Sequence, residues 1–115
     1  DIAKKSLVLL KKETNILPLK KQAQKIGLIG PLASDKTSPL GNWRIAADNN
    51  TAISVLEGLQ KFKGNELSHA QGVKLINKLP EGFHEEVEIN TTDKTGFEEA
   101  ISLAKNVEIV VMVLG

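Results

Sequence analysis

The 115-residue sequence contains no cysteine and no tyrosine, and aromatic residues make up only 3% of it. Without cysteine the chain forms neither disulfides nor thiolate metal sites, although this absence does not fix its compartment. The scarcity of aromatic rings leaves no stacking platform for single-stranded nucleic acid. A net charge of +1 gives no reason to expect nucleic acid or an anionic membrane as a partner. No apolar run approaches the roughly 20 residues that span a bilayer.

Length and composition fit one globular domain. The chain is long enough for one core, and 41% hydrophobic with 25% charged residues is ordinary for a soluble domain. The sequence does not begin with Met and shows no signal peptide. We therefore interpret residues 1–115 as a single partial domain taken from a longer polypeptide.

Apolar runs alternate with amphipathic stretches along the chain. The run that ends at Gly30-Pro31 is typical of a strand buried on both faces of a parallel sheet. Strands are expected at residues 25–29, 66–70 and 107–114, and helices at residues 1–12, 51–62 and from a cap at Thr92 or Asp93 to about Lys105. This alternation indicates βαβ units and a mainly parallel α/β sheet, with the third strand beside the first.

Several details of these elements can be specified. Asp1 is placed to cap the first helix, but residues 7–10 fit an extended conformation equally well. Residues 72–90 have no clear periodicity, and Pro80 and Gly82 favour an exposed loop. The inward faces of the second and third helices are expected to consist of Ile53, Leu56, Leu59 and Phe62, and of Phe97, Ala100, Ile101 and Ala104.

The single tryptophan, Trp43, lies in a loop of about twenty residues that follows the first strand. Ligands of open α/β sheets bind beyond the carboxyl ends of the strands. The ring is therefore placed where a ligand binds, or else it folds back as a lid on the core. The sequence leaves both alternatives open.

Other patterns carry little chemistry. The glycines at positions 27 and 30 lack the spacing of a dinucleotide fingerprint. His69 and His84 are too far apart in sequence to suggest a shared metal site. Two glycosylation sequons begin at Asn49 and Asn90, but the pattern is short and often arises by chance. Four acidic residues in one polar stretch are interpreted as a solvated cluster, not as an acid pair: Glu81, Glu85, Glu86 and Glu88.

The order of segments is more informative than any one of them. The chain contains SLVLLKKE at residues 6–13, ILPL at 16–19, KIGLIGPLA at 25–33, GNW at 41–43, VLEGL at 55–59, SHAQG at 68–72, FEEAI at 97–101 and VVMVLG at 110–115. This order and spacing resemble the first half of the C-terminal domain of glycoside hydrolase family 3, which includes β-glucosidases and β-xylosidases. Lys12 departs from the usual Asn of this pattern, and residues 48–50 and 73–92 match it poorly.

The resemblance implies a partial (α/β)6 sandwich, a three-layer, flavodoxin-like half that packs against a catalytic barrel. Family enzymes are retaining, with two carboxylates about 5 Å apart. By the resemblance, the nucleophilic aspartate belongs to the barrel and the acid/base glutamate to a loop beyond residue 115, so no catalytic residue falls in this chain. Trp43 matches the family's substrate-binding tryptophan, whose ring suits the apolar C–H face of a sugar. By the resemblance, Asn42 and Arg44 on either side of it are also expected to bind the substrate.

The resemblance thus predicts a fragment of a retaining β-glycosidase that acts on terminal β-linked sugars, inactive alone, without cofactor or metal, and periplasmic or secreted. The alternative is a free-standing, flavodoxin-like binding or interaction module. A receiver would need aspartates clustered at strand ends, whereas Asp35 and Asp48 both lie in the long loop. The continuous apolar strand at residues 107–114 is expected to have an open edge through which the chain self-associates.

Overall fold

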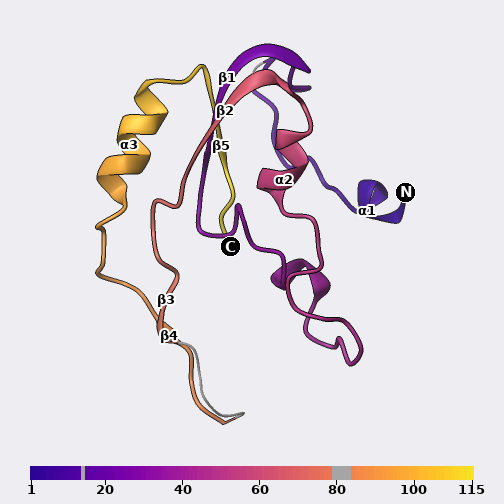
Figure 1. Cartoon of the computed structure of the whole chain (residues 1–115), viewed down its shortest axis with the longest axis vertical. Helices are drawn as coiled ribbons and strands as arrows, with labels where there is room; N and C mark the ends of the chain where they lie inside the picture. The colour runs from indigo at the N-terminus through magenta and orange to yellow at the C-terminus, as the bar shows by residue number, and fades with distance from the viewer. Residues whose placement is uncertain (14, 79–83) are drawn as a thin grey trace.

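The computed structural model describes residues 1–13, 15–78 and 84–115. A parallel three-stranded sheet forms its centre, in the order β2-β1-β5 (Figure 1). The central strand β1 (Gln22–Ile29) has β2 (Gly64–Ala70) on one side and β5 (Ile109–Met112) on the other. The predicted α/β class and the place of the third strand beside the first are confirmed. The first two strands begin earlier than predicted, and the third is shorter at both ends.

The central strand supplies the core. Leu28 lies opposite His69 of β2 and Val111 of β5. Ile26 and Leu28 are 2% and 0% exposed, and Ile29, whose side chain lies on the other face, is also buried. This confirms the prediction of a strand covered on both faces.

Helix α3 (Phe97–Lys105) covers one face of the sheet. A β-carbon on Gly27 would collide with the side chain of Leu103, so this glycine allows the helix to lie close to the strand. Ala100, Leu103 and Ala104 form the inner side of the helix.

The predicted start and face of α3 were partly wrong. The N-cap is Gly96, not Thr92 or Asp93. Asp93 instead accepts a hydrogen bond from the backbone N–H of Thr95 (3.0 Å), which makes a turn ahead of the helix. Phe97 and Ile101 are 42% and 52% exposed, because they lie toward the open side of β5.

Helix α2 (Val55–Gln60) lies on the other side of the sheet (Figure 1). Its start is fixed by a capping box, in which the Ser54 hydroxyl accepts from the Glu57 backbone N–H and the Glu57 carboxylate accepts from the Ser54 backbone N–H. The helix is therefore shorter than the predicted 51–62. Ile53 precedes the helix and Phe62 follows it, and they are 63% and 44% exposed, so their predicted places on the inner face were wrong.

The N-terminal helix α1 (Ile2–Lys5) is a single turn. Asp1 occupies the N-cap position without a side-chain hydrogen bond, and the Ser6 hydroxyl donates to the Ala3 carbonyl oxygen (2.9 Å) at the other end. Residues 7–10 are exposed and belong to neither a helix nor a strand, so the predicted helix at residues 1–12 ends at Lys5. The side chains of residues 7–10 are 63–92% exposed, so no described element packs closely against them. Without such packing a short helix is not stable in water.

Residues 72–90 contain more order than the predicted loop. The short strands β3 (Ile76–Lys78) and β4 (Glu88–Ile89) pair antiparallel, and Glu85, Glu86 and Glu88 are exposed as expected. Pro80, Glu81 and Gly82 lie outside the described residues. Within the described parts of the chain, no helix has the length and apolar character to cross a membrane.

Candidate functional site

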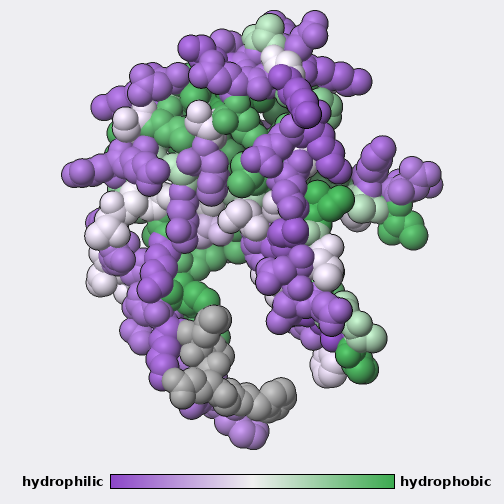
Figure 2. Space-filling view, in the orientation of Figure 1, coloured by the Kyte–Doolittle hydropathy of each residue, from purple (hydrophilic) through white to green (hydrophobic). Residues whose placement is uncertain are grey.

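Two limbs extend from the carboxyl edge of the sheet. The first consists of residues 34–53, which follow β1 and include the 3-10 helix η1 (Ser38–Leu40), and the second of residues 73–92, which follow β2. Figure 2 shows the open hollow between them. A groove of about 560 Å³ lies where the limbs leave the sheet, and its lining consists of Pro31, Leu32, Asp35, Ser38, Gln71, Lys74, Leu75, Ile76 and Asn77.

Asp35 shapes the base of the first limb. Its Oδ1 accepts hydrogen bonds from the backbone N–H groups of Thr37 (2.8 Å) and Ser38 (3.2 Å). A hydrogen bond from the Ser38 side chain, followed by that from the Thr37 N–H, lowers the pKa of the Asp35 carboxyl below its usual value. The carboxylate is thus charged at neutral pH and held in place at the wall of the groove.

Arg44 holds the tip of the same limb. Its guanidinium donates to the carbonyl oxygen of Gly41 (2.7 Å) and of Thr37 (3.4 Å), and to Oδ1 of Asn49 (2.8 Å). The side chain is half-buried. Arg44 was predicted to bind the substrate. In the structure its guanidinium makes these three hydrogen bonds to residues of its own loop.

Trp43, between Asn42 and Arg44, is 97% exposed. The alternative in which the ring folds back as a lid on the core is therefore wrong for this structure. Asn42 is exposed as well. The groove at the sheet edge does not include these residues in its lining, so the three predicted site residues form the outer tip of the limb.

The first limb is also tied to α2. The backbone N–H of Asn50 donates to Oγ1 of Thr37 (3.0 Å), and the Lys36 ammonium donates to Oε1 of Glu57 (2.9 Å). The Lys36 hydrogen bond, followed by that from the Ser54 backbone, lowers the pKa of Glu57. A loop without helix or strand periodicity is thus fixed by side-chain and backbone hydrogen bonds.

The sequence matches a known family of protein domains over most of its length. The model of the glycosyl hydrolase family 3 C-terminal domain matches residues 7–115. The chain belongs to this family. The predicted partial α/β sandwich and the resemblance found in the sequence are both confirmed.

Curated relatives of this family 3 domain are glycosidases by name. The chain is 32% identical to a periplasmic beta-glucosidase of Salmonella typhimurium and 31% identical to a beta-xylosidase of Formosa agariphila, each over its whole length. It is 39% identical, over 67% of its length, to a xylan 1,4-beta-xylosidase of Xylanibacter ruminicola. The chain spans only 16%, 15% and 9% of these relatives, respectively.

The remaining polar residues of the family 3 domain form no second candidate centre. In the described residues, no group of three or more His, Asp or Glu side chains is placed to hold a metal ion. His69 is half-buried in β2 and His84 is exposed. The side-chain amide of Asn90 donates to the carbonyl oxygens of Lys74 (2.8 Å) and Asp93 (3.0 Å), so this sequon asparagine links two segments of the chain.

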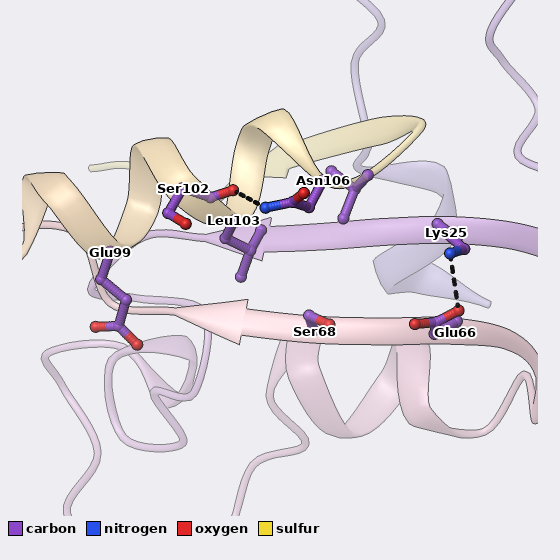
Figure 3. Close-up of a pocket in the computed structure, with 8 residues that line it drawn as sticks. Lys25, Glu66, Ser68, Glu99, Ser102, Leu103 and Asn106 are labelled. Atoms are coloured by element: carbon purple, nitrogen blue, oxygen red, sulfur yellow. Dashed lines mark hydrogen bonds and ion pairs between the residues drawn. The ribbon is translucent and has the colours of Figure 1, made fainter.

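A second groove of the family 3 domain, about 390 Å³, lies between α3 and the strands β1 and β2 (Figure 3). Lys25 and Glu66 form an ion pair across it (3.7 Å), and the Asn106 amide donates to the Ser102 carbonyl oxygen (2.7 Å). Lys25 and Glu66 precede the carboxyl halves of their strands, so this groove is separate from the edge that carries the limbs.

Two local signals in the sequence of the first limb and the start of α2 were not recognised, and two residues on the opposite side of the groove carried no signal. The Ser54-x-x-Glu57 spacing is a capping-box signal that fixes the helix start, and Asp35 followed by Thr37 and Ser38 is a signal for a side-chain-stabilised turn. Lys74 and Gln71 carried no signal, because only the pairing of β1 with β2 brings their segment opposite Asp35.

Proposed function

We propose that this chain is part of one domain of a longer retaining β-glycosidase, of the β-glucosidase or β-xylosidase type, that removes terminal β-linked sugars. The observation that carries the proposal is the ring of Trp43, exposed at the tip of a hydrogen-bonded limb on the carboxyl edge of a family 3 domain. This edge is where ligands of open α/β sheets bind. The names of the relatives, a beta-glucosidase and two beta-xylosidases, support the same class of activity.

In this proposal Trp43 stacks on the apolar face of a sugar ring at the mouth of the active site. Asn42 offers an amide for a hydrogen bond to a sugar hydroxyl. Arg44 borders the substrate, and its bonds to Gly41 and Asn49 fix the backbone that carries the ring.

The two catalytic carboxylates of the proposed enzyme come from outside residues 1–115. The nucleophile belongs to a barrel domain against which this domain packs, and the acid/base belongs to a loop of the sandwich that follows this segment. The proposed chemistry uses two carboxylates and water, so it needs no cofactor and no metal. The proposed location is periplasmic or secreted, in line with the name of the Salmonella relative.

The test uses the complete protein that contains this chain and, separately, residues 1–115. We expect the complete protein to hydrolyse aryl β-glucosides or β-xylosides with retention, and residues 1–115 to give no turnover. Trp43→Ala in the complete protein should lower kcat/KM by about 5- to 150-fold, which corresponds to the roughly 1–3 kcal/mol of an aromatic stacking contact. Trp43→Phe is the matched control, since it keeps an aromatic face.

Two results would contradict the proposal. Turnover by residues 1–115 that is lost on mutation of a glutamate within them would place the catalytic group here. A complete protein that hydrolyses no β-glycoside would favour the binding-module alternative.

We also propose that residues 1–115, as a free polypeptide, associate with a second copy through the edge of β5. The support is that β5 has β1 on one side and no described strand on the other.

A further inference from the structure

We infer that the groove between the two limbs binds the sugar units of an oligosaccharide that extend beyond the ring held by Trp43. This inference rests on the proposed function and deepens it, since it names the part of the substrate that this domain selects. It assigns a binding role to Asp35, Ser38, Gln71 and Lys74, all of which line the groove.

The two walls of the groove carry complementary hydrogen-bonding groups. On the first wall, Asp35 offers carboxylate oxygens and Ser38 a hydroxyl group. On the second wall, Lys74 offers an ammonium group and Gln71 an amide. A ligand that meets both walls must both donate and accept hydrogen bonds along its length, and the hydroxyl groups of a sugar do both.

The groove also has an apolar part. Pro31 and Leu32 on one side and Leu75 and Ile76 on the other contribute aliphatic surface between the polar groups. Pyranose rings present alternating hydroxyl edges and C–H faces, so a mixed lining of this kind fits them better than it fits a purely ionic ligand. The volume of about 560 Å³ lies within the range of roughly 300–1,000 Å³ that is usual for ligand sites.

One wall of the groove and the ring of Trp43 belong to the same limb. Asp35 is held by the Thr37 and Ser38 backbone N–H groups, and the Thr37 carbonyl oxygen in turn accepts from Arg44, which neighbours Trp43. An acceptor already fixed in this way loses little conformational freedom on binding. A single chain of sugar units can therefore meet Trp43 at the tip and Asp35 at the base of the same limb.

The test compares two substrates of the complete enzyme. One is the aryl β-glycoside that it hydrolyses best, and the other is the β-1,4-linked trisaccharide of the same sugar, xylotriose or cellotriose. We expect the double variant Gln71→Ala/Lys74→Met to raise KM for the trisaccharide about tenfold, as the loss of a charged hydrogen bond predicts. The same variant should leave kcat and KM for the aryl glycoside unchanged. Lys61→Met, at the C-terminal end of α2, is the matched lysine control.

The outcomes separate this inference from the proposed function. An unchanged KM for the trisaccharide in the double variant overturns the groove assignment while the proposed function stands. An equal rise in KM for both substrates also overturns it, because it indicates a general disturbance or a contact of the groove with the barrel. Absence of hydrolysis by the unmodified enzyme overturns the proposed function and this inference together.

Discussion

The backbone of Gly30 lies directly against the carbonyl group of Val113, where the central strand leaves the sheet. A β-carbon on Gly30 would collide with the Val113 carbonyl oxygen, and the φ angle of Gly30 is +136°. Toward β2, the Gly30 N–H donates to the Ala70 carbonyl oxygen (3.2 Å). Toward β5, the Val113 N–H donates to the carbonyl oxygen of Ile29 (2.8 Å). The carboxyl ends of three strands thus meet at one residue that must be glycine.

Gly30→Ala should destabilise the fold by about 1–3 kcal/mol or more, since alanine meets both a strained φ and a backbone collision. The measurement is the free energy of unfolding from urea denaturation. The matched control is Gly58→Ala in α2, where an added β-carbon meets nothing within 4 Å. That variant should gain up to about 1 kcal/mol from helix propensity. Equal stability of Gly30→Ala and wild type would show that the strand ends do not pack as described.

The fold was largely predictable because its signals are local. The apolar run before Gly30 and the β-branched run from Ile109 each stand between turn residues, and that pattern is typical of buried parallel strands. The alternation with helices then leaves few topologies, so the position of β5 beside β1 followed from general rules. The exact helix starts were missed for two reasons. Ser54 fixes the start of α2 through a capping box that periodicity does not report, although the Ser54-x-x-Glu57 spacing contains it. Gly96 caps α3 without a side-chain hydrogen bond, so the sequence carries no comparable signal there.

In the candidate site region the sequence indicated only the loop that carries Trp43, and the role of Trp43 in binding stays a prediction. An aromatic ring in a long loop after a buried strand points to a ligand edge, but whether the ring faces solvent depends on how the loop folds. Here that depends on Arg44 and its bonds to backbone oxygens, which no spacing rule contains. The second wall of the groove was not predicted for a similar reason, since only the pairing of β1 with β2 brings the segment of Lys74 to the same groove as Asp35.

The contribution of Glu57 to stability should depend on pH. Its pKa is lowered in the folded chain, chiefly by the hydrogen bond from Lys36, so its stabilising effect is present at neutral pH. The effect is lost as the pH falls below the ordinary value of 4.5 through the folded pKa. We expect Glu57→Gln to lower the urea midpoint at pH 7 and to match wild type in acid.

The partner variant separates the ion pair from the capping box. Lys36→Met removes the largest cause of the lowered pKa and leaves the Ser54 bonds in place. In that background, the pH-dependent effect of the Glu57→Gln substitution on the urea midpoint should shrink markedly. An effect of the same size with and without Lys36 would assign it to the cap alone.

Trp43 should report an aqueous environment in residues 1–115. The ring is 97% exposed and is the only tryptophan, so its fluorescence has one source. We expect a red-shifted emission maximum and efficient quenching by acrylamide. Arg44→Lys loses the forked hydrogen bonds to the loop and should speed the anisotropy decay of the ring without a shift in emission. A blue-shifted emission that resists quenching would contradict this prediction and favour the alternative in which the Trp43 ring packs on the core.

The open edge of β5 leads to the prediction of self-association. Residues 109–114 carry no charge, and β5 pairs with β1 alone among the described strands. An apolar groove of about 280 Å³ lies next to Met112 and Leu114 on one face of the sheet. A second groove of about 380 Å³ lies between the segments 11–13 and 16–19 and the strand residues 109–111, and its lining includes Lys11, Lys12 and Glu13 as well as apolar side chains. Proteins normally protect such an edge with charge, proline or a covering element.

A second copy of residues 1–115 satisfies this edge because it presents the same uncharged strand, and antiparallel pairing about a two-fold axis is the simplest arrangement. Light scattering after size exclusion, across a dilution series, should show a dimer that dissociates on dilution. Met112→Lys places a charge beside the edge at a side chain that is already 59% exposed, so it should give a folded monomer. Ile45→Lys, at a fully exposed side chain of the first limb, is the control and should leave the dimer intact. A wild-type chain that stays monomeric at high micromolar concentration contradicts the proposal, and so does a dimer that survives Met112→Lys but not Ile45→Lys.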